Sequence, residues 1–343
     1  MSTVSPSLDS MSHGDAADRA QARLAWARAA SGDAALQLER ASMDAGFRSY
    51  WRAATGGGTR IVMDSPPALE DVRPWLRIRD LLEAGGVRVP QVLARDVEAG
   101  FLLLEDLGGE TCLQALARLD AEELIDAAID QLLRLQAIAP PLDLPAFDAA
   151  MLRRELALFE DWFLGRHLGV TLSVDERAGW EAVQAHLIES MLAQPQVLVH
   201  RDYMLRNLMP VVGGVAVLDF QDAVRGPVAY DVACLLRDAF HSWPPSQLAI
   251  WLDRYHAKAQ GAGVPVPSRP QFQHDAALTG VQRHLKVLGI FARLHHRDGK
   301  PKYLADAPRF VAYLAAALPP HAALAPLARL LDRHVRPALE TVS

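Results

Sequence analysis

Lysine is missing from most of this 343-residue chain, because no lysine precedes Lys258 and every earlier side-chain cation other than histidine is arginine. Any lasting positive charge that this long stretch offers to a ligand must therefore come from arginine or from backbone N–H groups. Cysteine is almost as scarce. Cys112 and Cys234 are far apart and match no metal-ligand spacing, so we expect two small core residues in a reducing compartment. No apolar run approaches the roughly 20 residues that cross a bilayer.

An excess of positive charge is also lacking. The formal net charge is −6 and the pI is near 6.1, which argues against a general binder of nucleic acid or other polyanions. The N-terminal stretch has no apolar segment of the kind found in signal peptides, so we expect a mobile tail over residues 1–18 and a location in the cytoplasm. With 50% hydrophobic residues, the chain can bury one large core or two moderate ones.

The first third of the chain has the pattern of a small sheet with few helices. Residues 18–31 have apolar positions at helical spacing and end before Gly32. A second helix is expected over residues 66–86, where prolines and acids open the segment and two glycines close it. Five short strand-like runs are separated by turn-forming residues: 36–42, 47–54, 60–65, 88–96 and 100–106.

From Thr111 the apolar pattern becomes helical, and beyond Asp231 it stays helical almost to the end. The sequence therefore predicts an α+β protein of two lobes. A small N-terminal lobe, residues 19–107, carries five antiparallel strands and one main helix. A larger, mostly helical lobe covers residues 108–335, and residues 336–343 form a tail. We place the lobe boundary at the glycines that follow Glu105.

One stretch between the helical segments concentrates polar groups. In "VLVHRDYMLRNLMPVVGGVAVLDFQDA", residues 197–223, a buried strand delivers His-Arg-Asp into a loop. Asn207 opens a second strand, and a Gly-Gly turn sends the chain back to Asp219. Such a hairpin brings Asn207 and Asp219 to the same end of its two strands, one short loop away from Asp202.

These residue types suit phosphoryl transfer. One carboxylate can accept the proton of an attacking hydroxyl, while an amide oxygen and a second carboxylate can hold Mg²⁺ against nucleotide phosphates. The spacing H-R-D-x-x-x-x-N followed by D-F is the catalytic signature of kinases. The alternative is that these groups are only the polar ends of buried strands.

The chain resembles the aminoglycoside phosphotransferase-like kinases, a branch of the protein-kinase-like fold. Within that branch it is most similar to the anomeric N-acetylmuramate/N-acetylglucosamine kinases of cell-wall recycling. The resemblance covers about residues 20–335. It rests on "FRSYWR", "IVMDSPP", "FLLLEDLG", "VHRDYMLRNLM", "LDFQDAVRGPVAYDVACLLRD" and "QRHLKVLGIFARL".

The resemblance implies a role for each polar residue of the catalytic stretch. Asp202 would be the catalytic base, and Asn207 and Asp219 would be the Mg²⁺ ligands. His200 and Asp231 would brace the loop. For Asp222, a second metal or a substrate hydroxyl and a mere loop cap remain equally open.

The pattern departs from protein kinases at the strand lysine that contacts the α- and β-phosphates. Met63 or Asp64 stands there instead. Arg48 is our candidate for the missing charge, although it can also be read as a solvated surface residue. The turn from Ser42 to Gly46 would cover the phosphates. The backbone from Glu105 to Leu107 would face adenine.

The late segment 281–303 is rich in cations and poor in acids. If it faces the acceptor, it suits a neutral or anionic sugar better than a polycationic antibiotic. An arginine or lysine would pair with the lactyl carboxylate of N-acetylmuramate. The alternative is that its cations form a solvated helix face. The candidate acceptor-binding residues, beside Asp222, are Gln221, Gln282, Arg283 and Lys286.

The resulting hypothesis is ATP- and Mg²⁺-dependent phosphorylation of the anomeric hydroxyl of N-acetylmuramate or N-acetylglucosamine to the sugar 1-phosphate, in peptidoglycan recycling. We expect a monomer whose partners are ATP and an amino sugar, with neither a nucleic acid nor a membrane partner. One alternative is a kinase of aminoglycosides or other small molecules with a hydroxyl group. An alternative of another class is a catalytically inactive scaffold, which the missing lysine keeps open.

Overall fold

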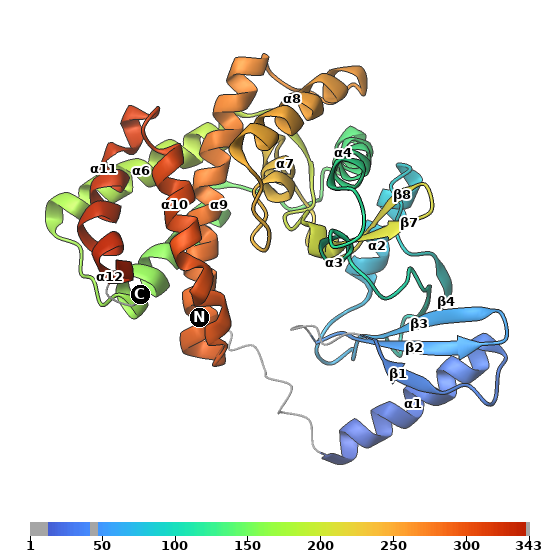
Figure 1. Cartoon of the computed structure of the whole chain (residues 1–343). Coiled ribbons are helices and arrows are strands. Elements are labelled where there is room, and N and C mark those ends of the chain that lie inside the picture. Colours follow the sequence, from blue (N-terminus) through green and yellow to red (C-terminus); the bar gives the residue numbers. More distant parts are fainter. Residues whose placement is uncertain (1–12, 42–46, 341–343) are drawn as a thin grey trace. The chain divides into compact units, whose positions relative to one another are not determined.

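The computed structural model describes residues 13–41 and 47–340. They divide into two compact units (Figure 1). Unit 1 comprises the chain up to Gln131 together with Arg206–Gln221, and unit 2 comprises Leu132–Leu205 together with the chain from Asp222 onward. Each unit is described by itself. No helix in residues 13–41 or 47–340 is both long and apolar enough to cross a membrane.

Unit 1 is built on a five-stranded antiparallel sheet with the order β1-β2-β3-β5-β4 (Figure 1). Its strands are β1 (Leu38–Arg40), β2 (Ser49–Thr55), β3 (Gly58–Asp64), β4 (Val92–Asp96) and β5 (Phe101–Glu105). All five lie inside or beside the runs expected from the sequence. The prediction of a small five-stranded antiparallel N-lobe and a helical C-lobe is confirmed.

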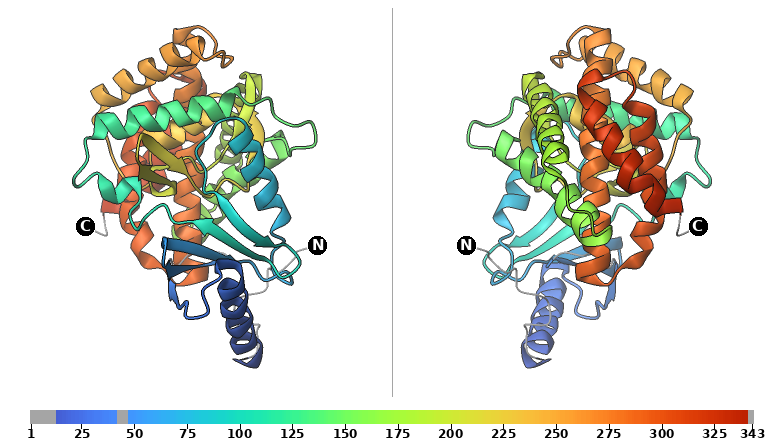
Figure 2. Two further views of the ribbon diagram at one scale, coloured as in Figure 1. Left: turned by 90° about the vertical axis from the view of Figure 1, so that its right-hand side faces the viewer. Right: turned by 90° about the vertical axis from the view of Figure 1, so that its left-hand side faces the viewer.

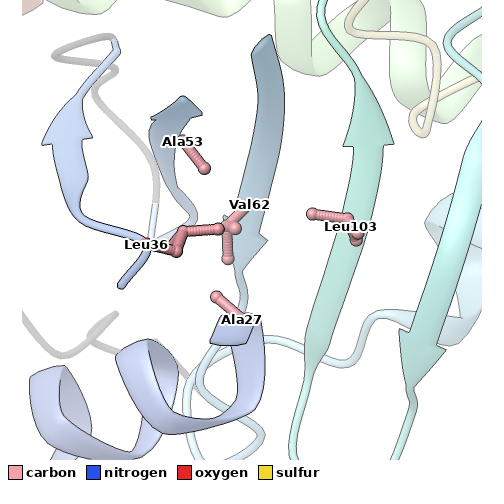
Figure 3. Packing of buried hydrophobic residues seen from close by; sticks show 5 residues of the cluster. All are labelled: Ala27, Leu36, Ala53, Val62 and Leu103. Atoms are coloured by element: carbon pink, nitrogen blue, oxygen red, sulfur yellow. The ribbon is translucent and has the colours of Figure 1, made fainter. Parts of the chain in front are cut away.

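Helix α1 (His13–Ser31) covers one face of this sheet. Ala27 of α1 packs with Leu36 and with Ala53, Val62 and Leu103 from three strands (Figure 3). The alternation of strand side chains explains this cluster, because every second residue points to the same face. The helix begins at His13, five residues before the expected start and inside the stretch read as a tail.

The other elements of unit 1 include the hairpin of the catalytic stretch. Strands β7 (Leu208–Val211) and β8 (Gly214–Val217) pair so that Val211 faces Gly214. The two-residue turn is therefore Val212-Gly213, one residue earlier than the Gly-Gly turn we expected, and Gly213 supplies its positive φ of 84°. The remaining elements are α2 (Arg73–Ala84), α3 (Cys112–Ala115), the 3₁₀ turn η3 (Leu205–Asn207) and α4 (Ala121–Ala137), whose sequence passes the division between the units.

Unit 2 is mostly helical and is organised around the long helix α9 (Arg269–Asp298), which contacts α5, α6, α7, α8 and α10 (Figure 2). Its middle is buried, and Gly289 lets it approach the backbone of Leu158 closely: a Cβ added there would lie 2.3 Å from the Leu158 carbonyl carbon. The other helices are α5 (Ala149–Leu158), η2 (Phe159–His167), α6 (Val174–Ala193), α7 (Ala229–Leu236), α8 (Pro245–Gly261), η4 (Pro301–Asp306), α10 (Ala307–Ala317), η5 (Ala322–Leu324), α11 (Ala325–Leu330), η6 (Leu331–Val335) and α12 (Arg336–Glu340).

Two features of unit 2 were not expected from the sequence. The segment after α5 is a π-helix, η2, rather than a continuation of the α-helix. Strand β6 (Gln196–Val199) also has an antiparallel partner, β9 (Val224–Pro227), in a stretch for which we had predicted no strand. Because β9 leads into α7, this pair positions the start of α7 beside the loop that follows β6.

Candidate functional site

Asp231, in the first turn of α7, stabilises the loop that follows β6 through hydrogen bonds. The buried Asp231 carboxylate accepts hydrogen bonds from the backbone N–H groups of His200, at 2.7 Å, and Arg201, at 3.0 Å. Arg201 has a φ of 78°, a left-handed conformation that costs energy for any residue except glycine. Two backbone N–H groups donate hydrogen bonds to this one carboxylate and stabilise the backbone, so the loop has a defined shape.

Asp202 follows directly and is partly exposed. Its backbone N–H lies 3.3 Å from Nδ1 of the buried His200 ring. Burial opposes the charge of the Asp202 carboxylate, but Lys286 and Arg283 outweigh it and hold the pKa below the usual range. The carboxylate is therefore ionised at neutral pH and able to accept a hydrogen bond or a proton.

A buried polar cluster surrounds this loop within unit 2, with Glu155 of α5 at its centre. One Glu155 oxygen accepts from Lys286 Nζ at 2.8 Å, and the other accepts from Gln282 Nε2 at 2.9 Å. Arg201 lies 3.3 Å from the same carboxylate, and Lys286 also donates to the Tyr230 hydroxyl at 3.2 Å. The Glu155 cluster, as we call these five residues, places α9 side chains beside Asp202.

Three of the predicted acceptor-binding residues thus belong to one region. Gln282, Arg283 and Lys286 are all buried on α9, so for them the alternative of a solvated helix face is wrong. Among the described residues, Gln282 Oε1 and Arg283 Nε have no hydrogen-bond partner. Since buried polar atoms are nearly always paired, these two are candidates for contacts to a ligand.

The end of the β7–β8 hairpin in unit 1 brings Asn207 and Asp219 together. Leu208 pairs with Val217, and Leu218 N–H donates to the Asn207 carbonyl at 2.9 Å, so the two residues follow each other across the hairpin. Asp219 has a φ of 60°; it and Arg201 are the non-glycine residues with positive φ in the part of the chain that is described. Strain of this kind tends to occur at functional positions.

Neighbouring side chains fix this end of the hairpin. Phe220 packs on Trp75 of α2, with ring centroids 5.1 Å apart. Gln221 Nε2 donates to Asp219 Oδ1 at 2.9 Å. Gln221 is therefore held by a proposed metal ligand, and its buried Oε1 has no partner in the described chain. Asp222 is exposed and makes no side-chain hydrogen bond or ion pair within that same part of the chain.

The oxygen donors of Asn207 and Asp219 fit a hard divalent cation such as Mg²⁺. An amide oxygen and a carboxylate are ligands that Mg²⁺ accepts, usually together with waters and phosphate oxygens. Described residues contain no cluster of three or more histidine, cysteine or acidic side chains that would form a closed metal cage. An open site completed by phosphate oxygens agrees with this donor set.

Arg48, just before β2, makes an ion pair in unit 1. Its Nε lies 3.2 Å from Glu70, and its buried Nη1 lacks a hydrogen-bond partner among residues 13–41 and 47–340. The reading of Arg48 as a solvated surface residue is therefore wrong.

Met63 and Asp64 stand where protein kinases have the strand lysine. Met63 pairs with Tyr50, whereas Asp64 points to the other face of the sheet, where Arg19 and Arg23 bind it. Ser42 and Gly46 lie outside the described residues.

The segment after β5 was expected to face adenine with its backbone. The Glu105 N–H is already used, because it donates to the Gln91 carbonyl at 2.9 Å, and the Glu105 carboxylate pairs with Arg88. Leu107 differs: within the described chain neither its N–H nor its carbonyl has a partner. Leu107 thus offers the free backbone groups, whereas Glu105 has only its carbonyl left to offer.

Sequence reasoning missed three residues that shape the loop. Glu155 and Tyr230 complete the cluster described above. The buried Asp238 accepts from Leu205 N–H at 3.1 Å and from Phe240 N–H at 2.6 Å, so it holds the far end of the catalytic loop. The one signal for Glu155 was an acid among the apolar positions of "MLRRELALFE"; Asp238 and Tyr230 carried none.

Comparisons with known proteins show to which family the chain is similar. The model of a phosphotransferase enzyme family matches residues 37–266. The chain is 51% identical to an N-acetylmuramate/N-acetylglucosamine kinase of Pseudomonas aeruginosa, over 86% of this chain and 88% of that one. It is 48% identical to a protein of the same name from Pseudomonas putida, over 90% of each chain. Choline kinase LicA from Streptococcus pneumoniae shares the fold, with a TM-score of 0.59, 15% identity and coverage of 86% and 99%.

Proposed function

Because the chain belongs to the phosphotransferase enzyme family, we propose that it transfers the γ-phosphoryl group of ATP to the anomeric hydroxyl of N-acetylmuramate or N-acetylglucosamine. The product is the sugar 1-phosphate. The observation that carries the proposal is Asp202, a carboxylate kept ionised by Lys286 and Arg283 on a loop whose backbone Asp231 holds. The names of the relatives supply the choice of sugar.

Asp202 acts as the base in this proposal. It accepts a hydrogen bond from the attacking hydroxyl and takes its proton as the bond to phosphorus forms. A low pKa makes Asp202 a weak base, which suits a reaction in which the hydroxyl loses its proton late. Orientation of the hydroxyl is then the larger part of its contribution.

Asn207 and Asp219 hold Mg²⁺, which offsets the negative charge of the phosphates when bound. Asp219→Ala should raise the Mg²⁺ concentration for half-maximal activity strongly, and Asn207→Ala should raise it less, because a neutral amide oxygen binds a hard cation more weakly than a carboxylate. Titration of activity with Mg²⁺ at fixed ATP measures both. Equal half-saturation in mutants and wild type would remove both residues from the metal site.

Arg48 supplies the positive charge that the absent strand lysine supplies elsewhere. Glu70 orients its guanidinium through Nε, which leaves Nη1 for a phosphate oxygen. The backbone around Leu107 completes the nucleotide site, whereas the contribution predicted for Ser42 to Gly46 lies outside the described residues. Gln282, Arg283 and Lys286 contact the acceptor in this proposal, and Gln221 and Asp222 remain further candidates for such a contact.

A panel of acceptors tests the proposal. Purified protein is incubated with ATP, Mg²⁺ and N-acetylmuramate, N-acetylglucosamine or kanamycin, and products are read by ³¹P NMR, which distinguishes a sugar 1-phosphate from other esters. We expect 1-phosphates from both amino sugars and no product from kanamycin. Kanamycin phosphorylation alone would indicate an antibiotic kinase, and no turnover of any acceptor would favour the scaffold.

A further inference from the structure

Arg237, the residue directly after α7, has no acidic side chain paired with it among the described residues. Within residues 13–41 and 47–340 its side chain makes no hydrogen bond and no ion pair. It is only partly exposed, and burial without a compensating acid lowers the pKa of its guanidinium. A desolvated charge normally has a partner, since an unpaired one is costly. Its partial exposure leaves it open to a ligand.

Gly280 of α9 makes room for this side chain. A Cβ at position 280 would lie 2.6 Å from Arg237 Nη1 and 3.0 Å from its Cδ. Glycine inside a helix costs about 1 kcal/mol relative to alanine, so its presence in the middle of α9 calls for a reason. The reason visible here is that the Arg237 guanidinium lies against the helix backbone.

His284, one turn further along α9, adds a second unsatisfied group. It is 2% exposed, and neither ring nitrogen has a partner among the described residues. Its ring packs on Phe310 and Tyr313, with centroids 5.4 and 5.2 Å away. Burial and then the nearby Arg237 lower its pKa well below the usual value, so the ring is neutral and can donate one hydrogen bond.

The cations that act on Asp202 are Lys286, Arg283 and Arg201, and each of them already has contacts within unit 2. Lys286 pairs with Glu155 at 2.8 Å, and Arg201 lies 3.3 Å from the same carboxylate. Arg283 lies over the Tyr230 ring and reaches the Arg201 carbonyl at 3.4 Å. We had expected Arg283 or Lys286 to bind an acidic substituent of the sugar. Lys286 is bonded to Glu155 and Tyr230, and Arg283 keeps its buried Nε unpaired among the described residues, so neither offers two free parallel donors to a carboxylate.

We propose that Arg237 and His284 form the subsite that binds the carboxylate of the lactyl group of N-acetylmuramate, and thereby set the preference for this sugar over N-acetylglucosamine. The inference rests on the proposed function. Arg237 lies against Gly280, and Arg283 is one of the charges that act on Asp202. These two positions of α9 are about 4.5 Å apart along the helix axis, which is comparable with the width of a sugar ring. A sugar with its anomeric hydroxyl at Asp202 would then direct the opposite side of the ring toward Arg237.

The chemistry of the two groups matches a carboxylate. A guanidinium can donate two parallel hydrogen bonds to the two oxygens, and a neutral imidazole can donate a third. N-acetylglucosamine has a hydroxyl where N-acetylmuramate has the lactyl ether, so it gains nothing from the Arg237 charge. The subsite should therefore increase kcat/KM for N-acetylmuramate alone, so N-acetylglucosamine serves as the internal reference in each experiment.

The first test compares kcat/KM for the two sugars in wild type and Arg237→Gln. We expect a loss of about 30- to 100-fold for N-acetylmuramate, since a desolvated charge pair is broken, and a change of less than about threefold for N-acetylglucosamine. Arg237→Lys should recover part of the loss. The matched control is Arg293→Gln, which removes a different half-buried arginine, located on α9, and should leave the ratio of the two sugars unchanged. Equal losses for both sugars in Arg237→Gln would overturn the proposal.

Gly280→Ala provides a second test that leaves Arg237 in place. The added methyl group displaces the flexible guanidinium rather than any backbone, and alanine favours the helix, so the protein should fold. N-acetylmuramate turnover should fall at least tenfold, with N-acetylglucosamine turnover preserved. An unchanged preference in a folded Gly280→Ala protein would contradict the role of Arg237 in this position.

Calorimetric binding separates this inference from the proposed function. If wild type phosphorylates neither sugar, the proposed function fails, and titration with N-acetylmuramate still tests the subsite. Binding that is lost in Arg237→Gln but kept in Arg293→Gln would support the subsite in a protein of another activity. Binding of N-acetylmuramate by wild type and by Arg237→Gln alike, or by neither, would overturn it.

Discussion

Asp64 in unit 1 and Glu155 in unit 2 are both buried carboxylates held by two cations, and the contrast between them is instructive. Asp64 receives Arg19 on one oxygen and Arg23 on the other, at 2.7 to 2.9 Å. The Arg23 guanidinium also lies over the Trp51 ring, with Cζ 3.7 Å from the ring centroid, and its buried Nε has no acceptor among the described residues. This cluster ties α1 to the sheet and leaves little for a ligand.

The Glu155 carboxylate contacts more side chains than Asp64 does, and more of those side chains keep an unpaired buried atom. Gln282 Oε1 and Arg201 Nε remain without partners among the described residues, and the catalytic loop with Asp202 adjoins them. A buried ion pair is therefore a poor indicator of function by itself. Unpaired donors and acceptors around it are the better indicator, because folding alone does not explain them.

The largest effect on kcat should come from Asp202, which lies beside the Glu155 cluster and has no counterpart beside Asp64. Asp202→Asn should lower kcat by about 10²- to 10⁴-fold, because general-base assistance is lost. Nucleotide affinity, measured by titration with a fluorescent ATP analogue, should stay within a factor of two or so of wild type. Retention of more than a tenth of wild-type kcat would mean that Asp202 is not the base.

Removal of one charge from each cluster tests the contrast directly. Asp64→Asn and Glu155→Gln should each lower the free energy of unfolding by about 3 kcal/mol, since each leaves buried cations without their acid. Only Glu155→Gln should also lower kcat in the protein that remains folded, because Glu155 holds Lys286 and Gln282 beside Asp202. Urea denaturation and kcat at a temperature well below Tm give the two quantities.

The outcome that would break the contrast is a loss of kcat in Asp64→Asn equal to that in Glu155→Gln. The Asp64 cluster would then influence chemistry as well as folding. Lys286→Met serves as a companion variant. It removes the cation that Glu155 binds and should reproduce the effect of Glu155→Gln on kcat.

A smaller effect is expected from the partly paired arginine of unit 1. Arg48→Ala should raise the KM for ATP about tenfold, equivalent to roughly 1.4 kcal/mol for one charge-assisted contact, and should change the KM for sugar less. The matched control is Arg60→Ala, because Arg60 is also a cation of the sheet but bonds only its neighbour's carbonyl. If both variants leave the KM for ATP unchanged, backbone N–H groups supply the phosphate contacts.

The smallest expected effect is that of mild acid. The pKa of Asp202 lies below its ordinary value, so its ionised form contributes stability above that value, and the contribution disappears only as the pH falls through the folded-state pKa. Between pH 8 and 5, kcat should therefore show no inflection from Asp202. Lys286→Met should move the acid limb of the kcat–pH profile upward. Burial raises the pKa of Asp231 to about 6, so an inflection there can come from Asp231. An inflection near pH 6 that persists in Asp231→Asn would contradict the assignment of a depressed pKa to Asp202.

Much of the fold follows from local sequence patterns. The family resemblance and the two-lobed fold are confirmed. Both could be predicted because apolar and polar residues alternate along the strands and the catalytic signature occupies one short stretch. Proximity of Asn207 and Asp219 is a consequence of a tight hairpin, and even a one-residue error in its turn did not change it. Contacts that depend on short loops are thus within reach of sequence reasoning.

The rest of the site depends on contacts between distant segments. Glu155 and Lys286 are 131 positions apart, and only the packing of α5 against α9 brings them together. Likewise, nothing in the sequence near Arg237 announces that Gly280 leaves space for it. The charge-rich segment after position 280 was recognised, but which cations are paired and which are free depends on tertiary structure.

The absence of lysine before Lys258 has a practical consequence for chemical labelling. Unit 1 contains no side-chain amine, so acylating reagents and amine-reactive nucleotide probes have no lysine to modify there. In unit 2, Lys286 is buried against Glu155, whereas Lys300 and Lys302 are exposed near the end of α9. A dye directed at lysines would therefore report on the helical unit and modify no side chain of the sheet unit.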